Sequence, residues 1–227
     1  MKTTLTFFGQ PKFSRSGAND LAIGYELFIR EAHGDEWTLP HDFGAITAPT
    51  IERLLGQVLE VLPKTTTIVS FNLEQTQFID PAFAAMVARV QAKTDIHIYT
   101  ELTERQDPNV TARELFFAAQ HFKQLGLLVC IDDVGTGFNT PELVLQLDPY
   151  IDEYKFALQN LRPFNTMGEV ESELQFWYDL AATKHKKFAI EGIETEDELL
   201  TITEKFPCDI LQGYYIGKPL LIPVGMT

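Results

Sequence analysis

An alternation of strand-like and helix-like segments runs through most of this chain and limits the folds open to it. Strand-like runs, rich in β-branched, aromatic and aliphatic residues, fall at residues 4–13, 21–30, 66–73, 96–104, 127–131, 153–158, 187–193 and 209–217. Apolar residues at helical spacing predict helices at 47–62, 80–92, 111–126, from 141, at 171–185 and from 195. Two strands followed by repeated helix–strand units predict an α/β protein, either a (β/α)₈ barrel or an open doubly wound sheet.

Three of the predicted helices carry a clear start signal. Asp80 stands in front of a proline and is a good N-cap for the helix at 80–92. Thr111 with Glu114, and Thr195 with Glu198, have the spacing of a capping box, in which the two side chains bond each other's backbone N–H groups. These signals place helix starts directly after predicted strands, as a barrel or a wound sheet requires.

Length and composition predict one soluble domain. The chain has 227 residues, 45% of them hydrophobic, which is enough for one sizeable core. No linker or low-complexity segment divides it, so we expect a single domain over residues 1–227. The 18 basic residues face 32 acidic ones, for a net charge of −14, and this argues against binding a nucleic acid polymer through its phosphates.

Cysteine usage and the N-terminus favour the cytoplasm. Cys130 and Cys208 are the two cysteines, and they suit a reducing compartment without a disulfide framework. The first residues lack the apolar segment of a signal peptide, and no run approaches the ~18 apolar residues of a membrane span. We therefore expect a cytoplasmic protein that does not bind a membrane.

Polar residues recur inside or near the C-terminal ends of the predicted strands. They are Asn72, Glu101, Asp132, Lys155, Glu191 and Gln212. Taken singly, such residues are more often helix caps or surface charges than functional groups. In a closed barrel, however, these strand ends meet at one rim, which is where barrel enzymes keep their sites. A shared chemistry therefore favours the barrel over the open sheet.

The joint set suits a hard divalent cation. Its oxygen donors are Glu26, Asn72, Glu101, Asp132, Asp133, Glu191 and Gln212. Oxygen ligands without histidine or cysteine suit Mg²⁺ or Mn²⁺ far better than Zn²⁺ or copper. With at least four carboxylates two ions are feasible, and such a pair would activate water for displacement at phosphorus. Chemistry alone leaves another hypothesis open: Lys155 among acids could form a Schiff base, or act as a base beside a metal in an enolising enzyme.

The motifs that carry these residues resemble those of the EAL-domain cyclic di-GMP phosphodiesterases. The matching segments, in the family's order, are "GQP" at 9–11, "YELFIR" at 25–30, "FNL" at 71–73, "TELTE" at 100–104, "DDVGTGF" at 132–138, "EGIET" at 191–195 and "LQGYYIGKPL" at 211–220. The resemblance covers nearly the whole chain. It implies a modified barrel whose first strand runs antiparallel to the others.

The resemblance also implies a role for each matching residue. Metal ligands would be Glu26, Asn72, Glu101, Asp132, Asp133 and Glu191. Glu191 could instead act as base, with Lys155 orienting the attacking water. Substrate contacts would come from Arg30, Gln10 and Gln212, and Glu104 would anchor the loop at 134–139. The implied cofactor is one or two Mg²⁺ or Mn²⁺ ions, and the implied ligand is cyclic di-GMP.

One departure from the family pattern bears on activity. The family usually has an Asp two residues after the lysine, where this chain has Ala157. Alanine offers no side-chain oxygen, and losing a charged partner near a metal commonly costs 10–100-fold in affinity or activity. The expected function is a phosphodiesterase that opens cyclic di-GMP to linear pGpG, with reduced turnover. The alternative is a domain that binds cyclic di-GMP, or a regulatory protein partner, without useful turnover. The family resemblance further predicts a homodimer formed through the segment after Gly137.

Overall fold

The structure is a computed structural model that describes residues 4–15 and 21–224, so the two ends of the predicted 1–227 domain lie outside the described residues. Its strands are Leu5–Ser14 (β1), Gly24–His33 (β2), Glu36–Thr38 (β3), Ile68–Leu73 (β4), His97–Leu102 (β5), Leu128–Ile131 (β6), Glu153–Ala157 (β7), Lys187–Glu191 (β8), Ile210–Leu211 (β9) and Leu220–Leu221 (β10). Its α-helices are Ala48–Val61 (α1), Gln75–Ile79 (α2), Pro81–Gln91 (α3), Ala112–Gln124 (α4), Pro141–Leu147 (α5), Glu171–Lys184 (α6) and Glu196–Lys205 (α7).

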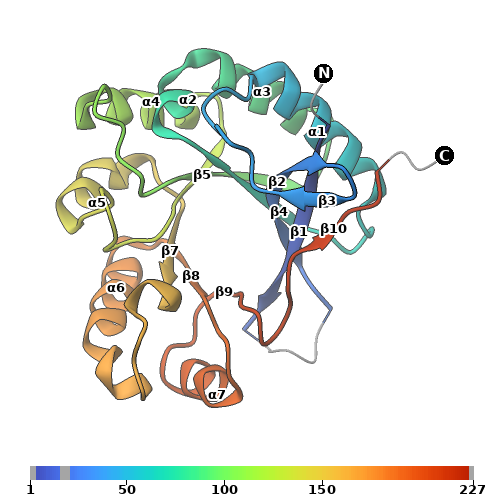
Figure 1. Ribbon diagram of the computed structural model, residues 1–227. Coiled ribbons are helices and arrows are strands. Elements are labelled where there is room, and N and C mark those ends of the chain that lie inside the picture. The colour runs from blue at the N-terminus through green and yellow to red at the C-terminus, as the bar shows by residue number, and fades with distance from the viewer. Residues whose placement is uncertain (1–3, 16–20, 225–227) are drawn as a thin grey trace.

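Eight of these strands close into a barrel, which decides between the two predicted architectures. The sheet runs in the order β10-β1-β9-β8-β7-β6-β5-β4-β2-β3, and a further pairing between β1 and β2 closes the ring. From β2 through β4 to β9 the strands are parallel, whereas β1 is antiparallel to both of its barrel neighbours. The predicted modified (β/α)₈ barrel is therefore confirmed, and the helices surround it (Figure 1).

The helix starts follow the predicted capping chemistry. The Asp80 side chain accepts a hydrogen bond from the backbone N–H of Ala82 and begins α3. The capping boxes of Thr111 and Thr195 are both formed, at α4 and α7. Each cap satisfies backbone donors that would otherwise lack a partner, and so fixes the residue at which its helix begins.

The last predicted strand is much shorter than its sequence suggests. Residues 209–217 were expected to be extended, but β9 covers only Ile210–Leu211. The chain turns at Gly213, whose backbone carbonyl accepts hydrogen bonds from the N–H groups of Ile216 and Gly217. An added Cβ at Gly213 would lie 2.2 Å from the Ile193 carbonyl oxygen, so only glycine permits this close approach.

Two apolar layers position the site. The larger core lies between the outer face of the strands and the helices, and includes Phe71, Leu102 and Trp177. A smaller cluster fills the lower part of the barrel interior with Ile68, Tyr99, Cys130, Ala189 and Ile210. Because side chains alternate across a strand, the next inward positions lie two residues further along, toward the C-terminal ends. These are the positions of the predicted site residues.

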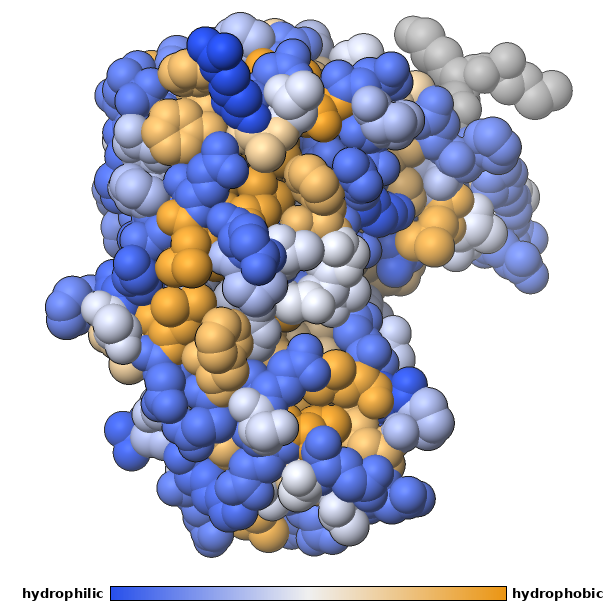
Figure 2. All heavy atoms as spheres, turned by 90° about the vertical axis from the view of Figure 1, so that its left-hand side faces the viewer, coloured by the Kyte–Doolittle hydropathy of each residue, from blue (hydrophilic) through white to orange (hydrophobic). Residues whose placement is uncertain are grey.

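The helix face of the molecule mixes apolar and polar groups. Figure 2 shows the side that carries α5 and α6, where apolar side chains form separate patches among polar ones. Phe117 of α4, Leu145 of α5 and Phe176 of α6 are exposed. None of the helices in the described part of the chain is long and apolar enough to cross a membrane.

Candidate metal and phosphodiester site

A cavity of about 510 Å³ opens at the C-terminal ends of the barrel strands. Its lining includes most of the predicted site residues: Gln10, Glu26, Arg30, Asn72, Glu104, Asp132, Asp133, Lys155, Glu191 and Gln212. These residues lie on different strands or on the loops that directly follow them. The convergence expected of a closed barrel is thus present at this rim.

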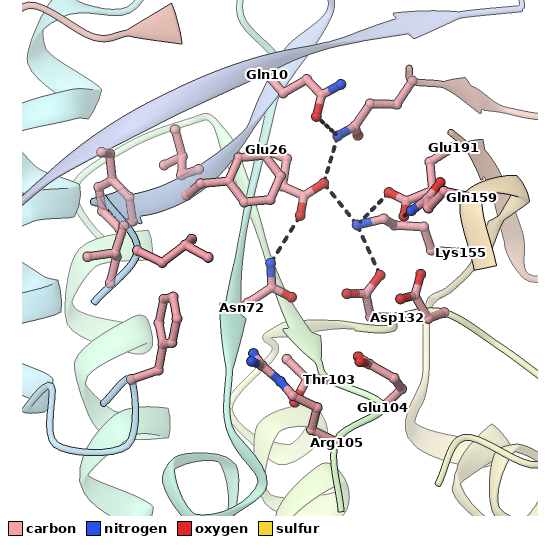
Figure 3. Close-up of a pocket in the computed structure, with 18 of the residues that line it drawn as sticks. Gln10, Glu26, Asn72, Thr103, Glu104, Arg105, Asp132, Lys155, Gln159 and Glu191 are labelled. Atoms are coloured by element: carbon pink, nitrogen blue, oxygen red, sulfur yellow. Dashed lines mark hydrogen bonds and ion pairs between the residues drawn. The ribbon is translucent and has the colours of Figure 1, made fainter. Parts of the chain in front are cut away.

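Lys155 is the centre of the site. Its Nζ lies 2.9 Å from Glu26 Oε2, 2.7 Å from Glu101 Oε2, 3.0 Å from Asp132 Oδ1 and 3.0 Å from Glu191 Oε2. Figure 3 shows the ammonium group pointing into the space between Glu26, Asp132 and Glu191. Burial lowers the pKa of Lys155, but the four carboxylates outweigh it and raise the pKa well above its usual value. Lys155 therefore carries a permanent positive charge in the metal-free protein.

Glu26 is held by two amide side chains. The Asn72 Nδ2 group donates to Glu26 Oε1 at 3.0 Å, and the Gln212 Nε2 group donates to Glu26 Oε2 at 2.7 Å. Because the Asn72 amide nitrogen faces Glu26, its Oδ1 atom is left buried, without a hydrogen-bond partner in the described part of the chain. A buried carbonyl oxygen without a donor is a natural cation ligand.

The predicted substrate contacts divide into two groups. Gln212 Nε2 also lies 3.1 Å from Gln10 Oε1, and Gln10 Nε2 donates to the Gly217 carbonyl at 3.0 Å, so this pair ties the closing turn to the barrel. Arg30 is half-buried, with its guanidinium 5.9 Å from the ring of Phe8 and 5.6 Å from that of Phe28. Contact of any of them with substrate stays a prediction.

The two adjacent acids after β6 face different partners. Asp132 points to Lys155, whereas Asp133, with a φ of 47° in the left-handed region, lies beside Asp132 and Glu104. The three carboxylates offer oxygens that all lie within 4.8 Å of one another. Burial, and then the charge of Asp132, raises the pKa of Asp133 to about 7. This trio could hold a cation apart from the Glu26 and Asn72 oxygens.

The loop at 134–139 lies against Glu104, although through the backbone. The Phe138 N–H donates to the Glu104 carbonyl at 2.8 Å. An added Cβ at Gly137, where φ is +54°, would lie 2.5 Å from the same oxygen, which explains the second glycine of the Gly-Thr-Gly motif. Buried Asn139 adds a side-chain hydrogen bond to the Asp132 carbonyl. The anchoring role of the Glu104 carboxylate itself stays a prediction.

Glu191 is held by a residue that the sequence interpretation missed. Its Oε2 atom contacts Lys155, and its Oε1 atom accepts a hydrogen bond from the Gln159 side chain. Burial raises the pKa of Glu191 to about 8. Ala157 lies beside Glu191 in the β7–β8 pairing and is 4% exposed, so this position places a methyl group next to Glu191. Gln159, two residues further on, supplies a polar side chain there.

The donor set fits a hard divalent cation. Carboxylate and amide oxygens dominate, and the Oδ1 atoms of Asn72 and Asp133 are buried without a hydrogen-bond partner in the described segments. Four carboxylates contact Lys155, and those of Asp133 and Glu104 lie beside one of them, so the acids of the site outnumber its buried lysines. Glu26, Asn72, Glu101 and Asp132 could hold one divalent cation, and Asp132, Asp133 and Glu104 could hold a second.

Comparisons with known proteins agree with this geometry. The EAL domain family model matches residues 5–219. The cyclic di-GMP phosphodiesterase PdeF of Escherichia coli is 25% identical over 216 residues, 89% of this chain. An uncharacterized signaling protein of Caulobacter vibrioides is 27% identical over 158 residues, 66% of this chain. The chain spans only 26% and 18% of the lengths of these two relatives.

Solved structures share the fold at lower identity. The PaMucR phosphodiesterase in complex with c-di-GMP has a TM-score of 0.76 at 22% identity, over 96% of this chain and 92% of the other. The FimX EAL domain of Pseudomonas aeruginosa, bound to c-di-GMP, has a TM-score of 0.76 at 17% identity, over 98% and 94%. The Bacillus subtilis YkuI protein, with c-di-GMP and calcium, has a TM-score of 0.76 at 19% identity, over 97% and 57%. With a family model that matches nearly its whole length and a barrel of the same architecture, this chain belongs to the EAL domain family.

Proposed function

We propose that this protein is a metal-dependent phosphodiesterase that hydrolyses cyclic di-GMP to linear pGpG. The observation that carries the proposal is the meeting of Lys155 with four carboxylates from separate strands at one cavity, in a member of the EAL family. The PdeF relative is named for this activity, and structures similar to this one hold cyclic di-GMP. Mg²⁺ or Mn²⁺ is the proposed cofactor.

The residues of the chain divide the work of hydrolysis. A bound divalent cation would supply an activated water and offset negative charge at phosphorus. Glu191 accepts the proton of the attacking water, and its contacts with Lys155 and Gln159 hold the carboxylate in place for that transfer. Lys155 stays charged and offsets the negative charge that develops on the phosphodiester. Arg30, whose guanidinium lies near the rings of Phe8 and Phe28 at the cavity wall, is placed to contact a phosphate.

The experiment that tests this function is hydrolysis of cyclic di-GMP by the purified protein with Mn²⁺ or Mg²⁺, with the product read by chromatography. Glu191→Gln keeps the shape of the side chain and removes the base, so we expect a loss of about 10²–10⁴-fold in kcat. Binding of cyclic di-GMP, measured by calorimetry, stays within a few fold. Glu204→Gln, on the exposed side of α7, is the matched control and keeps full activity.

A second function is favoured by one observation. Ala157, beside Glu191 on β7, offers no acid at the position where the family usually has one, so this protein could bind cyclic di-GMP as a receptor with little turnover. Binding of cyclic di-GMP by the unaltered protein, without any pGpG in the same samples, would replace the enzyme by the receptor. Absence of both binding and product would leave a regulatory protein partner as the remaining role.

Dimerisation is a further part of the proposal. The loop at 134–139 leads from the acids into α5, which lies on the face shown in Figure 2 and exposes Leu145. A second copy that packs there would couple assembly to the site. Analytical ultracentrifugation should show a concentration-dependent dimer that Leu145→Glu weakens and Leu200→Glu, on α7, does not. A monomer under all ligand conditions contradicts the idea.

A further inference from the structure

A second buried lysine, Lys12, contacts Glu101 from below the cavity. Lys12 lies on β1 and is 1% exposed, and its Nζ is 2.9 Å from Glu101 Oε1. Glu101 is completely buried. Neither Lys12 nor Glu101 is among the described residues that line the cavity. Lys12 therefore lies deeper in the barrel than a substrate in the cavity would reach. None of the roles proposed above uses this contact.

The contact fixes the direction of the Glu101 carboxylate. Lys12 binds Oε1, and Lys155 binds Oε2 at 2.7 Å, so the two oxygens are held by cations on opposite sides. Rotation of the carboxylate would break at least one of these charge-assisted hydrogen bonds. With Oε1 engaged below, Oε2 is the oxygen directed toward Lys155 and the other carboxylates of the rim. Lys12 thus fixes the orientation in which Glu101 presents its other oxygen to the rim.

Lys12 has a partner of opposite charge at its own depth. Glu153, on β7, is 1% exposed, and neither of its carboxylate oxygens has a hydrogen-bond partner in the described structure. Its charge raises the pKa of Lys12, whereas burial lowers it. Repulsion between Lys12 and a cation at the rim would make Mn²⁺ binding stronger when Lys12 is removed. Loss of the contact that orients Glu101 would make it weaker, so the two effects have opposite signs.

We propose that Lys12 is a positioning residue of the metal site, which orients Glu101 from beneath and touches neither the substrate nor the ion. The inference rests on the proposed metal-dependent function, because Glu101 is one of its ligands. It gives a functional role to a residue of the antiparallel strand β1, whose Lys12 lies in the barrel interior below the cavity.

The first test is direct binding of Mn²⁺, measured by calorimetry on Lys12→Met, which removes the ammonium and keeps the length of the side chain. Loss of an orienting partner of a ligand typically weakens metal binding by 10–100-fold, and we expect an effect in that range. The KM for cyclic di-GMP at saturating Mn²⁺ stays within about twofold, since Lys12 does not line the cavity. General damage to the fold would instead change both quantities.

Glu101→Gln provides the second test, through a double-mutant cycle. If Lys12 acts through Glu101, Lys12→Met has no further effect on Mn²⁺ affinity once Glu101→Gln is present. Glu153→Gln is the charge control and should leave Mn²⁺ affinity within about threefold of the unaltered protein. Lys12→Met combined with Glu153→Gln removes one charge of each sign from the interior, so it remains testable if Lys12→Met alone fails to fold. The combined variant should still bind Mn²⁺ weakly.

The outcomes separate the inference from the function on which it rests. An unaltered protein that binds no Mn²⁺ removes the proposed metal site and, with it, the role of Lys12. Mn²⁺ binding by the unaltered protein that Lys12→Met leaves unchanged overturns the role of Lys12 alone. Lys12→Met combined with Glu153→Gln could instead bind Mn²⁺ as tightly as the unaltered protein. That result would show that Lys12 acts through charge balance and would also overturn its positioning role. Weak binding in both Lys12→Met variants, with no effect in the Glu101→Gln background, supports it.

Discussion

The lower and upper layers of the barrel interior are made by the same strands and differ completely in character. The lower layer includes Tyr99, Cys130, Ala189 and Ile210, and the residues two positions later on each strand are Glu101, Asp132, Glu191 and Gln212. Two residues along each strand therefore separate an apolar layer that stabilises the barrel from a polar layer that could bind ligands and catalyse a reaction. A small barrel can thus hold many buried acids in one layer because the layer beneath it is a packed apolar core.

β7 breaks the division and shows its limits. Its lower position is Glu153 and its upper position is Lys155, so here both layers are charged. Burial raises the pKa of Glu153, which favours the protonated carboxyl, while Lys12 opposes that shift. The lower layer thus tolerates one acid because a lysine from β1 lies at the same depth.

The largest expected effect comes from removing the cation of the upper layer. Lys155→Met leaves the buried carboxylates of Glu26, Asp132 and Glu191 without their counter-ion and Glu101 with Lys12 alone, and breaking a buried ion pair typically costs 3–5 kcal/mol. We expect hydrolysis to fall below detection and the Tm of the metal-free protein to fall sharply. Added Mn²⁺ should raise the Tm of this variant more than that of the unaltered protein. The exposed lysine at the start of β8 gives the control, Lys187→Met, and equal effects of the two variants would contradict a central role for Lys155.

Adding an acid to the upper layer should strengthen metal binding and catalysis. Ala157→Asp places a carboxylate beside Glu191, and we expect Mn²⁺ affinity and turnover to rise about tenfold. Ala157→Asn has the same shape without the charge and should give little gain. Calorimetry with Mn²⁺ and the rate of pGpG formation measure both. A rise with Asn equal to that with Asp would show that bulk, and not charge, is missing at this position.

The acids of the upper layer should make stability depend on pH. Burial raises the pKa of Glu191 from 4.5 to about 8 and that of Asp133 from 3.8 to about 7. The folded protein keeps these protons over a range in which the unfolded chain has released them, so the free energy of unfolding falls as pH rises from about 5 to 8. The Tm of the metal-free protein should fall over the same pH range. Thermal melts in a chelator measure this slope, and Glu191→Gln should flatten it.

The smallest effect is expected in the lower layer. Ile210→Val removes one buried methylene group, which costs about 0.5–1.5 kcal/mol. The Tm should fall by a few degrees. Mn²⁺ affinity and kcat should not change, because Ile210 belongs to the apolar cluster and does not line the cavity. A loss of Mn²⁺ affinity in this variant would mean that the two layers are coupled.

Much of this organisation could be predicted from the sequence, because local signals and global fold agree. The capping boxes at Thr111 and Thr195 formed as expected, and the polar strand ends met at one rim. The closed barrel followed from those strand ends, since an open sheet would separate them. The antiparallel direction of β1 came from the family resemblance and not from periodicity.

Two residues escaped the sequence interpretation for physical reasons. Lys12 was missed because lysines are mostly exposed at the protein surface. One signal was available: Lys12 is two residues from Gln10, so both side chains lie on the same side of the strand, opposite to that of Phe13. Gln159 was missed because it follows β7 in a short 3₁₀ turn, where no periodicity shows which way a side chain points. The contacts of both depend on tertiary structure.

The antiparallel course of β1 also decides where a tether would meet this molecule. Leu5 pairs with Glu31, beyond the Gln10–Glu26 pair at the cavity, and β10 pairs with β1 around Phe8. The start of β1 and the strand β10 therefore both lie toward the open end of the barrel. In an all-parallel barrel a polypeptide joined ahead of the first strand would arrive at the closed end. Here a fused reporter or sensory module would sit beside the entrance, within reach of whatever enters or leaves.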